Sequence, residues 1–327
     1  MKVWGTDMSL IRIEELRKEY KISKTGGKGK IFGKEYEIKH AVDGITFQVE
    51  EGETIGYIGP NGAGKSTTIK MMSGILTPTS GKIEIAGLIP YKSRKKYAGK
   101  IGVVFGQRTQ LWWELPVIDS FRLLKSIYRI PDSIYEANMG LFNEILELDQ
   151  FINKPVRQLS LGQRVRADFA ASLLHKPKLV FLDEPTIGLD VLAKEKIRTF
   201  IKEMNRSRNV TVLITSHDMD DIEKICKRTM IIDHGKLIYD GSIEQLKEAY
   251  QTKAVLTVKF EHLPDLPIQL PGCTLLSQEG KDARLSFSKK EMSARVVLEN
   301  LLRQYAIKDF QLQDTSVEEI IKEIYRR

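Results

Sequence analysis

A glycine-rich stretch, GPNGAGKST at residues 59–67, has the spacing of a phosphate-binding loop. It follows the apolar segment ETIGYI and precedes TTIKMMSGIL, so a strand should lead into it and a helix should leave it. Backbone N–H groups of such a loop surround a phosphate, and the helix start adds positive charge. Lys65 would reach the β- and γ-phosphates, while the Ser66 hydroxyl would be a ligand of Mg²⁺. The candidate nucleotide-binding residues are Gly59, Pro60, Asn61, Gly62, Ala63, Gly64, Lys65, Ser66 and Thr67.

Two acidic residues end a second apolar stretch, LVFLDEP at residues 179–185. Asp183 would stand at the carboxyl end of a buried strand and hold Mg²⁺ through water. Glu184 would orient or deprotonate the water that attacks the γ-phosphate. Acids after a strand can also serve only to cap the next helix, but the phosphate loop upstream favours the catalytic interpretation.

Gln107 and His217 each follow a further apolar segment. The Gln107 amide could contact Mg²⁺ and the attacking water, and the His217 imidazole could contact the γ-phosphate. A histidine at a strand end is more often structural, yet the other motifs favour a role in the site. We therefore predict a nucleotide-hydrolysing centre that uses Mg²⁺, in which Glu184, His217 and Gln107 are catalytic and Ser66, Gln107 and Asp183 hold the metal.

The segment LSLGQ at residues 159–163 stands at the start of a predicted helix that begins at Ser160. A helix start presents unsatisfied N–H groups and partial positive charge, so an anion is expected there. The candidate anion-binding residues of this signature segment are Ser160, Leu161, Gly162 and Gln163.

Apolar periodicity places these motifs on an α/β core with a mixed sheet over residues 1–250. Continuous apolar strands such as LVFLD, each followed by a helix, indicate parallel strands with crossover helices. Between about residues 108 and 177 the apolar spacing becomes helical, which predicts an inserted helical subdomain. Residues 251–327 have the pattern of a small α+β domain. Its expected elements are strands at 253–260, 274–277, 283–288 and 306–313 and helices at 290–304 and 316–326.

The composition is that of an ordinary globular protein, with 42% hydrophobic and 29% charged residues. No apolar run approaches the ~18–20 residues of a membrane helix, and the N-terminal segment lacks the features of a signal peptide. We therefore expect a cytoplasmic protein in which Cys226 and Cys273 are reduced thiols. The net charge of +8 is diffuse. It is locally high in residues 21–34, an expected mobile loop, and in 92–96, where a solvated surface is favoured over phosphate or lipid head-group contact.

Taken in order, the motifs resemble those of the ATP-binding cassette (ABC) ATPases, and the resemblance covers about residues 8–250. Each motif alone is shared with other nucleotide enzymes, but P-loop kinases and small GTPases lack a segment like LSLGQ. The resemblance therefore implies a P-loop ATPase fold and Mg²⁺-dependent ATP hydrolysis. The motifs that carry it are GPNGAGKST, Gln107, LSLGQ, LVFLDEP, the GLD of residues 188–190 and His217.

The resemblance also implies that two such domains stack head to tail with ATP between them. Ser160 and Gly162 of one copy would then face the γ-phosphate held by Lys65 of the other, and Asp190 would couple the two sites. The family usually has glycine where this chain has Leu161, a departure that concerns the local backbone geometry. The partner would be a second copy of this chain or a homologous ATPase subunit.

In this family an aromatic residue upstream of the phosphate loop stacks on adenine, because an aromatic face binds a base plane by dispersion. Tyr20 matches that position. The insertion at residues 21–34 leaves Tyr36, or neither tyrosine, as the alternative.

Trp112 and Trp113 are adjacent, so one neighbour cannot bury both, and exposed aromatic side chains often mark a binding surface. In transporters of this family the region after the glutamine receives a short helix of the membrane subunit. Trp112, Trp113 and Leu115 are therefore candidates for permease docking. The alternative places both tryptophans in the core of the helical subdomain.

Within the family the chain looks most like the ATPase subunits of bacterial type-2 exporters, which pair with separately encoded membrane permeases. This similarity implies a peripheral protein on the cytoplasmic face of the membrane that is bound to integral permease subunits and acts in export. The other class considered is a soluble ABC-type ATPase that acts on the ribosome or on nucleic acid. A single cassette, and no sustained heptads between Lys65 and Asp183, disfavour that class, so no specific nucleic-acid partner is expected.

Overall fold

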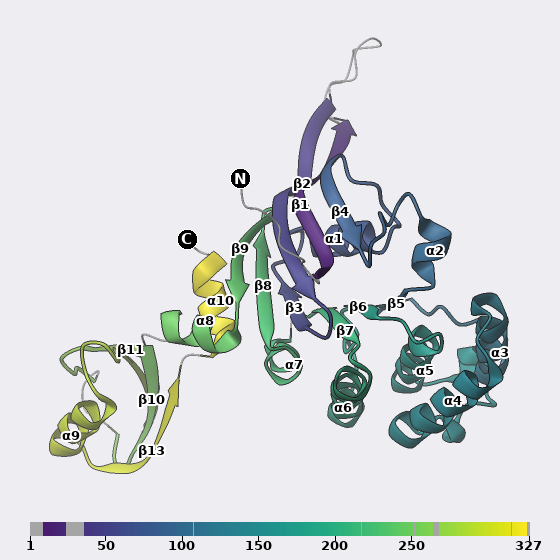
Figure 1. The fold of residues 1–327 in the computed structure, drawn as a ribbon. Coiled ribbons are helices and arrows are strands. Elements are labelled where there is room, and N and C mark those ends of the chain that lie inside the picture. Colours follow the sequence, from purple (N-terminus) through teal and green to yellow (C-terminus); the bar gives the residue numbers. More distant parts are fainter. Residues whose placement is uncertain are drawn as a thin grey trace, which may run out of the picture. The chain divides into compact units, whose positions relative to one another are not determined.

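The computed structural model describes residues 9–23, 36–106, 108–216, 218–250, 253–263, 268–314 and 316–325. The chain forms two compact units that divide after Asp240 (Figure 1). The sequence pattern predicts this division after residue 250. The contacts instead place helix α8 (Ile243–Tyr250) in the C-terminal unit.

A six-stranded sheet forms the centre of the first unit, in the order β5-β6-β7-β3-β8-β9. Its strands are β3 (Thr54–Ile58), β5 (Ile101–Phe105), β6 (Leu179–Asp183), β7 (Thr211–Thr215), β8 (Arg228–Asp233) and β9 (Lys236–Gly241). From β5 to β8 neighbouring strands pair in parallel. The side chains of β3 and β7 are buried throughout, as is usual for parallel strands covered on both faces. The carboxyl ends of β3, β5, β6 and β7 therefore meet at one edge of the sheet.

A second, antiparallel sheet of the first unit has the strand order β2-β1-β4. Its strands are β1 (Ser9–Ser23), β2 (Tyr36–Glu50) and β4 (Ser80–Ile85). Because β1 continues to Ser23, residues 21–23 are strand and not part of the expected loop, and residues 24–34 lie outside the described part of the chain. Ile13 of β1 and Tyr57 of β3 belong to one buried core, so the two sheets pack together.

A helical subdomain lies between β5 and β6 in the chain (Figure 1). It contains α3 (Val117–Tyr128), α4 (Asp132–Leu146), α5 (Leu161–Leu173) and 3₁₀ helices at Leu148–Gln150 and Val156–Gln158. The other helices described in the first unit are α1 (Lys65–Met72), α2 (Arg94–Ala98), α6 (Val191–Arg208) and α7 (Met219–Ile225). The rings of Phe142 and Phe169 meet Phe200 of α6 edge-on, with centroids 5.6 and 6.2 Å apart. Aromatic packing thus joins the subdomain to the sheet core.

The C-terminal unit contains an antiparallel sheet of order β11-β12-β10-β13. Its elements after α8 are β10 (Lys253–Phe260), β11 (Cys273–Glu279), β12 (Asp282–Ser288), α9 (Ala294–Gln304), β13 (Ile307–Asp314) and α10 (Val317–Tyr325). All of the strands and helices expected here are present, but α9 begins at Ala294, because Ser293 caps it, and not at 290. Leu256 and Leu301 lie in a core of this unit's own. The predicted α/β core with an inserted helical subdomain and a small C-terminal α+β domain is confirmed.

Two smaller expectations concern membrane helices and thiols. In the described part of the chain no helix has both the length and the apolarity to cross a membrane. Cys226 is buried, Cys273 is half-buried, and both are free thiols. Burial raises the pKa of the Cys226 thiol, so this side chain stays protonated and unreactive.

A buried ion pair joins the segments that follow β6 and β7. Asp221 of α7 is fully buried, and its carboxylate accepts a hydrogen bond from Arg198 Nε of α6 at 2.6 Å. The Thr186 hydroxyl, from the loop after β6, donates to the same carboxylate. This cluster fixes both loops close to the carboxyl ends of their strands.

Replacing Asp221 by Ala should lower the free energy of unfolding by about 3–5 kcal/mol, because the buried Arg198 charge would keep only the more distant Glu195 carboxylate, at 3.6 Å. Asp220→Ala is the matched control: Asp220 is exposed on the same helix, and its loss should cost less than about 1 kcal/mol. Urea unfolding followed by circular dichroism measures both changes. Equal losses in the two variants would contradict the stabilising role of the pair.

Candidate functional site

The phosphate loop connects β3 to α1, as the sequence predicts. Gly62 and Gly64 adopt left-handed backbone conformations, with φ of +83° and +108°. A Cβ atom on Gly64 would lie 2.3 Å from the Ala41 carbonyl oxygen. Glycine is therefore required at residue 64 both by its conformation and by the close approach of β2. The loop is further fixed by the Gly235 N–H, which donates to the Ala63 carbonyl at 3.0 Å.

The Lys65 side chain folds back under this loop. Its ammonium donates hydrogen bonds to the carbonyl oxygens of Gly59 at 2.6 Å and Pro60 at 3.1 Å. Burial lowers the pKa of Lys65, and the nearby carboxylates of Glu184 and Asp183 oppose this change. The positive charge is thus held between the loop and the two acids.

Asp183 and Glu184 lie at the carboxyl end of β6 and share one partner on β7. The Thr215 hydroxyl donates to Asp183 Oδ1 at 2.7 Å. The Glu184 N–H donates to the carbonyl oxygen and to the hydroxyl of Thr215, both at 3.1 Å. Glu184 has a φ of +53°, a left-handed conformation that is uncommon for this residue type and is often found at functional sites.

Gln107 and His217 themselves lie outside the described residues. Their neighbours are described, however, and both lie beside the acid pair. The Gly106 N–H donates to the Asp183 carbonyl at 2.8 Å, and Thr215 is opposite Asp183 in the strand register. The predicted roles of Gln107 and His217 stay predictions.

A cleft of about 600 Å³ joins the phosphate loop to Glu184 and to the β1–β2 hairpin. Its lining includes Tyr20, whereas Tyr36 lines no part of it. The Tyr20 ring is exposed, and the Lys18 ammonium lies 5.5 Å from its centroid. A cleft of this size can hold a nucleotide, with Tyr20 available to stack on its base.

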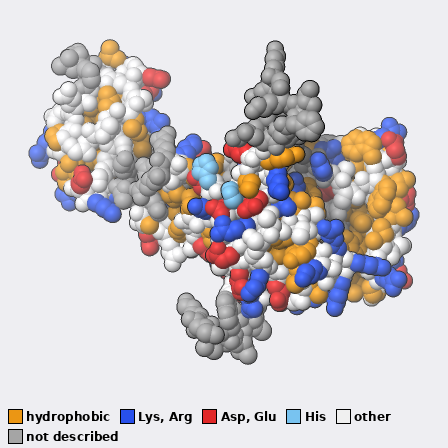
Figure 2. Space-filling view, turned by 90° about the horizontal axis from the view of Figure 1, so that it is seen from above, with side chains coloured by type: hydrophobic (Ala, Val, Ile, Leu, Met, Phe, Trp, Pro, Cys, Tyr) orange, Lys and Arg blue, Asp and Glu red, His pale blue; other side chains and the backbone are white. Residues whose placement is uncertain are grey.

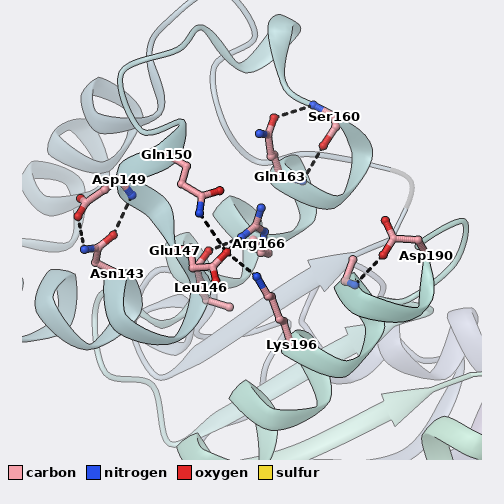
Figure 3. A network of polar contacts seen from close by, with 11 residues as sticks. Asn143, Leu146, Glu147, Asp149, Gln150, Ser160, Gln163, Arg166, Asp190 and Lys196 are labelled. Atoms are coloured by element: carbon pink, nitrogen blue, oxygen red, sulfur yellow. Dashed lines mark hydrogen bonds and ion pairs between the residues drawn. The ribbon is translucent and has the colours of Figure 1, made fainter.

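The signature segment begins α5 with a reciprocal pair of hydrogen bonds (Figure 3). The Gln163 N–H donates to Ser160 Oγ at 3.2 Å, and the Ser160 N–H donates to Gln163 Oε1 at 3.0 Å. The predicted helix start at Ser160 is therefore found. The sequence analysis missed the reciprocal cap, although serine followed three residues later by glutamine is its usual signal.

The signature segment, at Leu161, lies close to the GLD turn, which ends at Asp190. A Cβ atom on Gly188 would lie 3.0 Å from Leu161 Cδ2, so the leucine that replaces the usual glycine packs beside this turn. Asp190 caps α6, because its carboxylate accepts a hydrogen bond from the Ala193 N–H at 2.8 Å. The start of α5 and the start of α6 are therefore neighbours.

Glu147, at the end of α4, links α5 and α6 by charge (Figure 3). Arg166 of α5 donates to its carboxylate at 3.3 Å and to the Leu146 carbonyl at 2.7 Å. Lys196 of α6 donates to the same carboxylate oxygen of Glu147. The sequence analysis did not identify this cluster, which joins three helices around the signature segment.

Trp112 and Trp113 are exposed, by 40% and 48% respectively. These values contradict the alternative that both tryptophans lie in the core of the helical subdomain. The Arg164 guanidinium lies 5.8 Å from the Trp113 ring, and Leu115 is half-buried beside them in the chain. The three candidate docking residues therefore include an exposed aromatic pair.

Asp168 of α5 is a residue near the site that the sequence analysis missed. Its carboxylate is 5% exposed and accepts hydrogen bonds from Thr109 Oγ1 at 2.8 Å and the Gln110 N–H at 3.0 Å. Burial raises its pKa to about 6, against the opposing effects of Thr109, Gln110 and Arg164. The available signal was a single acidic residue inside the otherwise apolar run ADFAASLL.

Comparison with known proteins agrees with this site. Residues 42–187, which contain the phosphate loop, the signature segment and the acid pair, match the family model for the ABC transporter. The chain is 30% identical to the ABC transporter ATP-binding protein NatA of Bacillus subtilis, over 65% of this chain and 86% of NatA. It is 35% identical to the linearmycin resistance ATP-binding protein LnrL of Bacillus subtilis, over 64% of this chain and 67% of LnrL.

Among solved structures, a dimeric post-hydrolysis state of the ATP-binding cassette MJ0796, bound to ADP and phosphate, is similar to this chain. The TM-score is 0.61 at 26% identity, over 71% of this chain and 98% of that chain. The similarity thus covers nearly the whole of the solved cassette.

Asp168 should make folding less favourable as the pH rises from about 4 to about 7. Because its pKa is raised to about 6 in the folded protein, the folded state holds a proton there that the unfolded chain has already lost. The cost is about 3 kcal/mol, complete above about pH 7 and absent below about pH 4. Asp168→Asn does not titrate. Its free energy of unfolding, minus that of the wild type, should therefore be larger in urea titrations at about pH 7.5 than at about pH 5. A difference that is the same at both pH values would contradict the prediction.

Proposed function

Since this chain belongs to the ABC transporter family, as one of its ATP-binding subunits, we propose that it dimerises around ATP and Mg²⁺ and drives a separate membrane permease in export. As an ABC ATPase it hydrolyses ATP to power transport. The observation that carries the proposal is the single cleft that unites the phosphate loop, Glu184 and Tyr20. A base, a phosphate chain and a reactive γ-phosphate can occupy it together.

In this proposal the phosphate loop and Lys65 bind the phosphates, and Tyr20 stacks on the adenine. Mg²⁺ takes oxygen ligands, which the Ser66 hydroxyl and the Asp183 carboxylate would supply, with the Gln107 amide as a further predicted donor. This donor set fits Mg²⁺, which would offset the negative charge of the phosphates. Lys65, close to the two acids, adds a fixed positive charge at the γ-phosphate.

Glu184 is the proposed general base. Its backbone is fixed by two hydrogen bonds to Thr215, and its side chain lines the cleft, so its carboxylate can take the proton of a water aligned with the γ-phosphate. His217 would hold the γ-phosphate from the end of β7. Gln107 would position the same water from the end of β5.

The proposed partner in the ATPase is a second copy of this chain or a homologous ATPase subunit. Ser160 and Gly162 lie at a helix start whose N–H groups suit the γ-phosphate of the other copy. Val191 and Leu192, next to Asp190, are exposed by 80% and 78%. Such apolar side chains beside the signature segment are expected at a surface that a partner covers.

The proposed permease contact is formed by the exposed Trp112 and Trp113 and the half-buried Leu115, and it would place the protein on the cytoplasmic face of a membrane. Export is supported by the similarity to type-2 exporter ATPases and to LnrL, a protein named for linearmycin resistance. A nucleic-acid partner is expected to need a basic stripe. Figure 2 instead shows Lys and Arg interspersed with Asp and Glu on the visible face of the first unit.

Glu184→Gln should leave ATP binding intact but lower kcat by about 10²–10⁴-fold, because the amide cannot accept the proton of water. The variant should therefore accumulate as an ATP-bound dimer in size-exclusion chromatography. Glu136→Gln, an exposed position on α4, is the control and should behave as the wild type. Normal hydrolysis by Glu184→Gln would remove Glu184 from its assigned role.

The same variant tests the transport function. We expect Glu184→Gln protein, purified from its own cells with ATP, Mg²⁺ and mild detergent, to carry a polytopic membrane protein identifiable by mass spectrometry. Recovery of ribosomal proteins or nucleic acid in its place would mean that the ATPase assignment is right and the transporter assignment is wrong.

Replacing both Trp112 and Trp113 by Ala should abolish the recovery of the membrane protein, because their exposed rings would supply most of the contact energy. ATP hydrolysis by the isolated subunit should change by less than about twofold, since neither ring lines the nucleotide cleft. Ile127→Ala, a change at another exposed apolar residue of the helical subdomain, is the control. Unchanged recovery with the double variant would exclude this surface as the docking site.

A further inference from the structure

Residues 108–115, here called the tryptophan loop, lead from the sheet to the helical subdomain. Before this loop, the Gly106 N–H is bonded to the Asp183 carbonyl, next to the acid pair. Within the loop, the Trp112 N–H donates to Ser120 Oγ of α3 at 3.2 Å, and the Trp113 carbonyl accepts a hydrogen bond from the Arg157 N–H at 3.0 Å. Between residues 106 and 112 the hydrogen-bond partners of the chain therefore change from residues of the sheet to residues of the subdomain.

Asp168 fastens the loop to α5 at this crossing point. Its carboxylate accepts hydrogen bonds from Thr109 Oγ1 and the Gln110 N–H, and its backbone carbonyl accepts one from Gln110 Nε2 at 3.1 Å. The Thr109 hydroxyl oxygen also accepts a hydrogen bond from the Leu111 N–H at 3.1 Å. Three consecutive residues of the loop thus depend on one side chain of the signature helix.

Burying the Asp168 carboxylate to bond the loop costs free energy, and packing alone would not require a charged residue here. Asp168 is buried, and among the described residues it has no salt-bridge partner, because Arg164 acts on it only from a distance. An apolar side chain would fill the same space without loss of hydration. The charge gives α5 a strong, directional acceptor for two donors of the loop.

We propose that Asp168 is a positioning residue that makes α5 and the tryptophan loop move as one body. The proposal rests on the proposed function, in which the ATP of a partner subunit binds at the start of α5. A displacement of α5 then reaches Thr109, two residues from Gln107, and continues to the exposed rings of Trp112 and Trp113. Asp168 thereby couples the signature segment of one site to the glutamine and the docking surface of the same chain.

Tryptophan fluorescence tests this coupling in the full chain. The chain has three tryptophans, so Trp4→Phe leaves Trp112 and Trp113 as the reporters, and Glu184→Gln keeps ATP bound. In this background ATP should change the emission. Asp168→Ala should reduce that change by about fivefold or more, while dimer formation shifts by less than about twofold in ATP concentration. Asp168→Asn, which retains an acceptor oxygen, should restore most of the response.

Two further variants separate coupling from a loss of structure. Ser172→Ala is the matched control: Ser172 is buried on the same helix, but its hydroxyl donates only within α5, to the Phe169 carbonyl at 2.8 Å, so the response should stay as in the parent. Thr109→Val removes the donor from the loop side, and its effect should not add to that of Asp168→Ala. This variant also keeps the test available if Asp168→Ala fails to fold.

The outcomes distinguish the two proposals. Dimer formation with a lost fluorescence response in Asp168→Ala supports the coupling. A full response in Asp168→Ala, or equal losses in Asp168→Ala and Ser172→Ala, would overturn it and leave the proposed function untouched. Failure of the parent Glu184→Gln protein to dimerise with ATP would instead overturn the proposed function.

Discussion

The parallel pairing of β5, β6, β7 and β3 is the constraint on which the site depends. Parallel strands end at the same edge of a sheet, so the loops that follow them meet although they are far apart in sequence. The phosphate loop follows β3, Gln107 follows β5, the acid pair follows β6 and His217 follows β7. In the proposed function each strand positions one part of the chemistry, although Lys65 and Ser66 of the phosphate loop are already the first residues of α1.

The helical subdomain is held together by two kinds of contact, apolar packing and bonds to carboxylates. The rings of Phe142 and Phe169 pack on Phe200, and this contact is apolar and continuous with the sheet core. By contrast, Glu147 joins α4, α5 and α6 by charge, and the Asp168 carboxylate joins α5 to Thr109 of the tryptophan loop by a hydrogen bond. Hydrogen bonds to carboxylates fix direction as well as distance, which suits a segment proposed to present its N–H groups to a partner.

Most of the sheet could be predicted from the sequence because a buried parallel strand reads as an unbroken apolar run, as LVFLD does. The helix start at Ser160 could be predicted from its residue type and the pattern that follows. The extent of β1 could not, because Tyr20, Lys21 and Ile22 near its end are all exposed and show no alternation of burial. The partners of Asp168 could not be predicted either, since they lie on a loop from an earlier part of the chain, which only the folded topology brings to α5.

The boundary between the two units is another feature that the sequence pattern does not predict correctly. The composition changes near residue 250, but α8 ends there and its buried side chains Ile243 and Leu246 belong with the C-terminal unit. A change of pattern along a chain marks where a strand or helix ends. Which unit that element joins is decided by what covers its apolar face.

The two hydrogen bonds of the Thr215 hydroxyl restrict which substitutions this site can accept. One hydroxyl donates to the Asp183 carboxylate and accepts from the Glu184 N–H, so both acids depend on the same atom. A substitution at residue 215 alters both at once, and serine is the one replacement that keeps this hydroxyl on a side chain of similar reach. The tolerance to substitution at residues 183, 184 and 215 is therefore coupled, although Thr215 is given no part in the proposed chemistry.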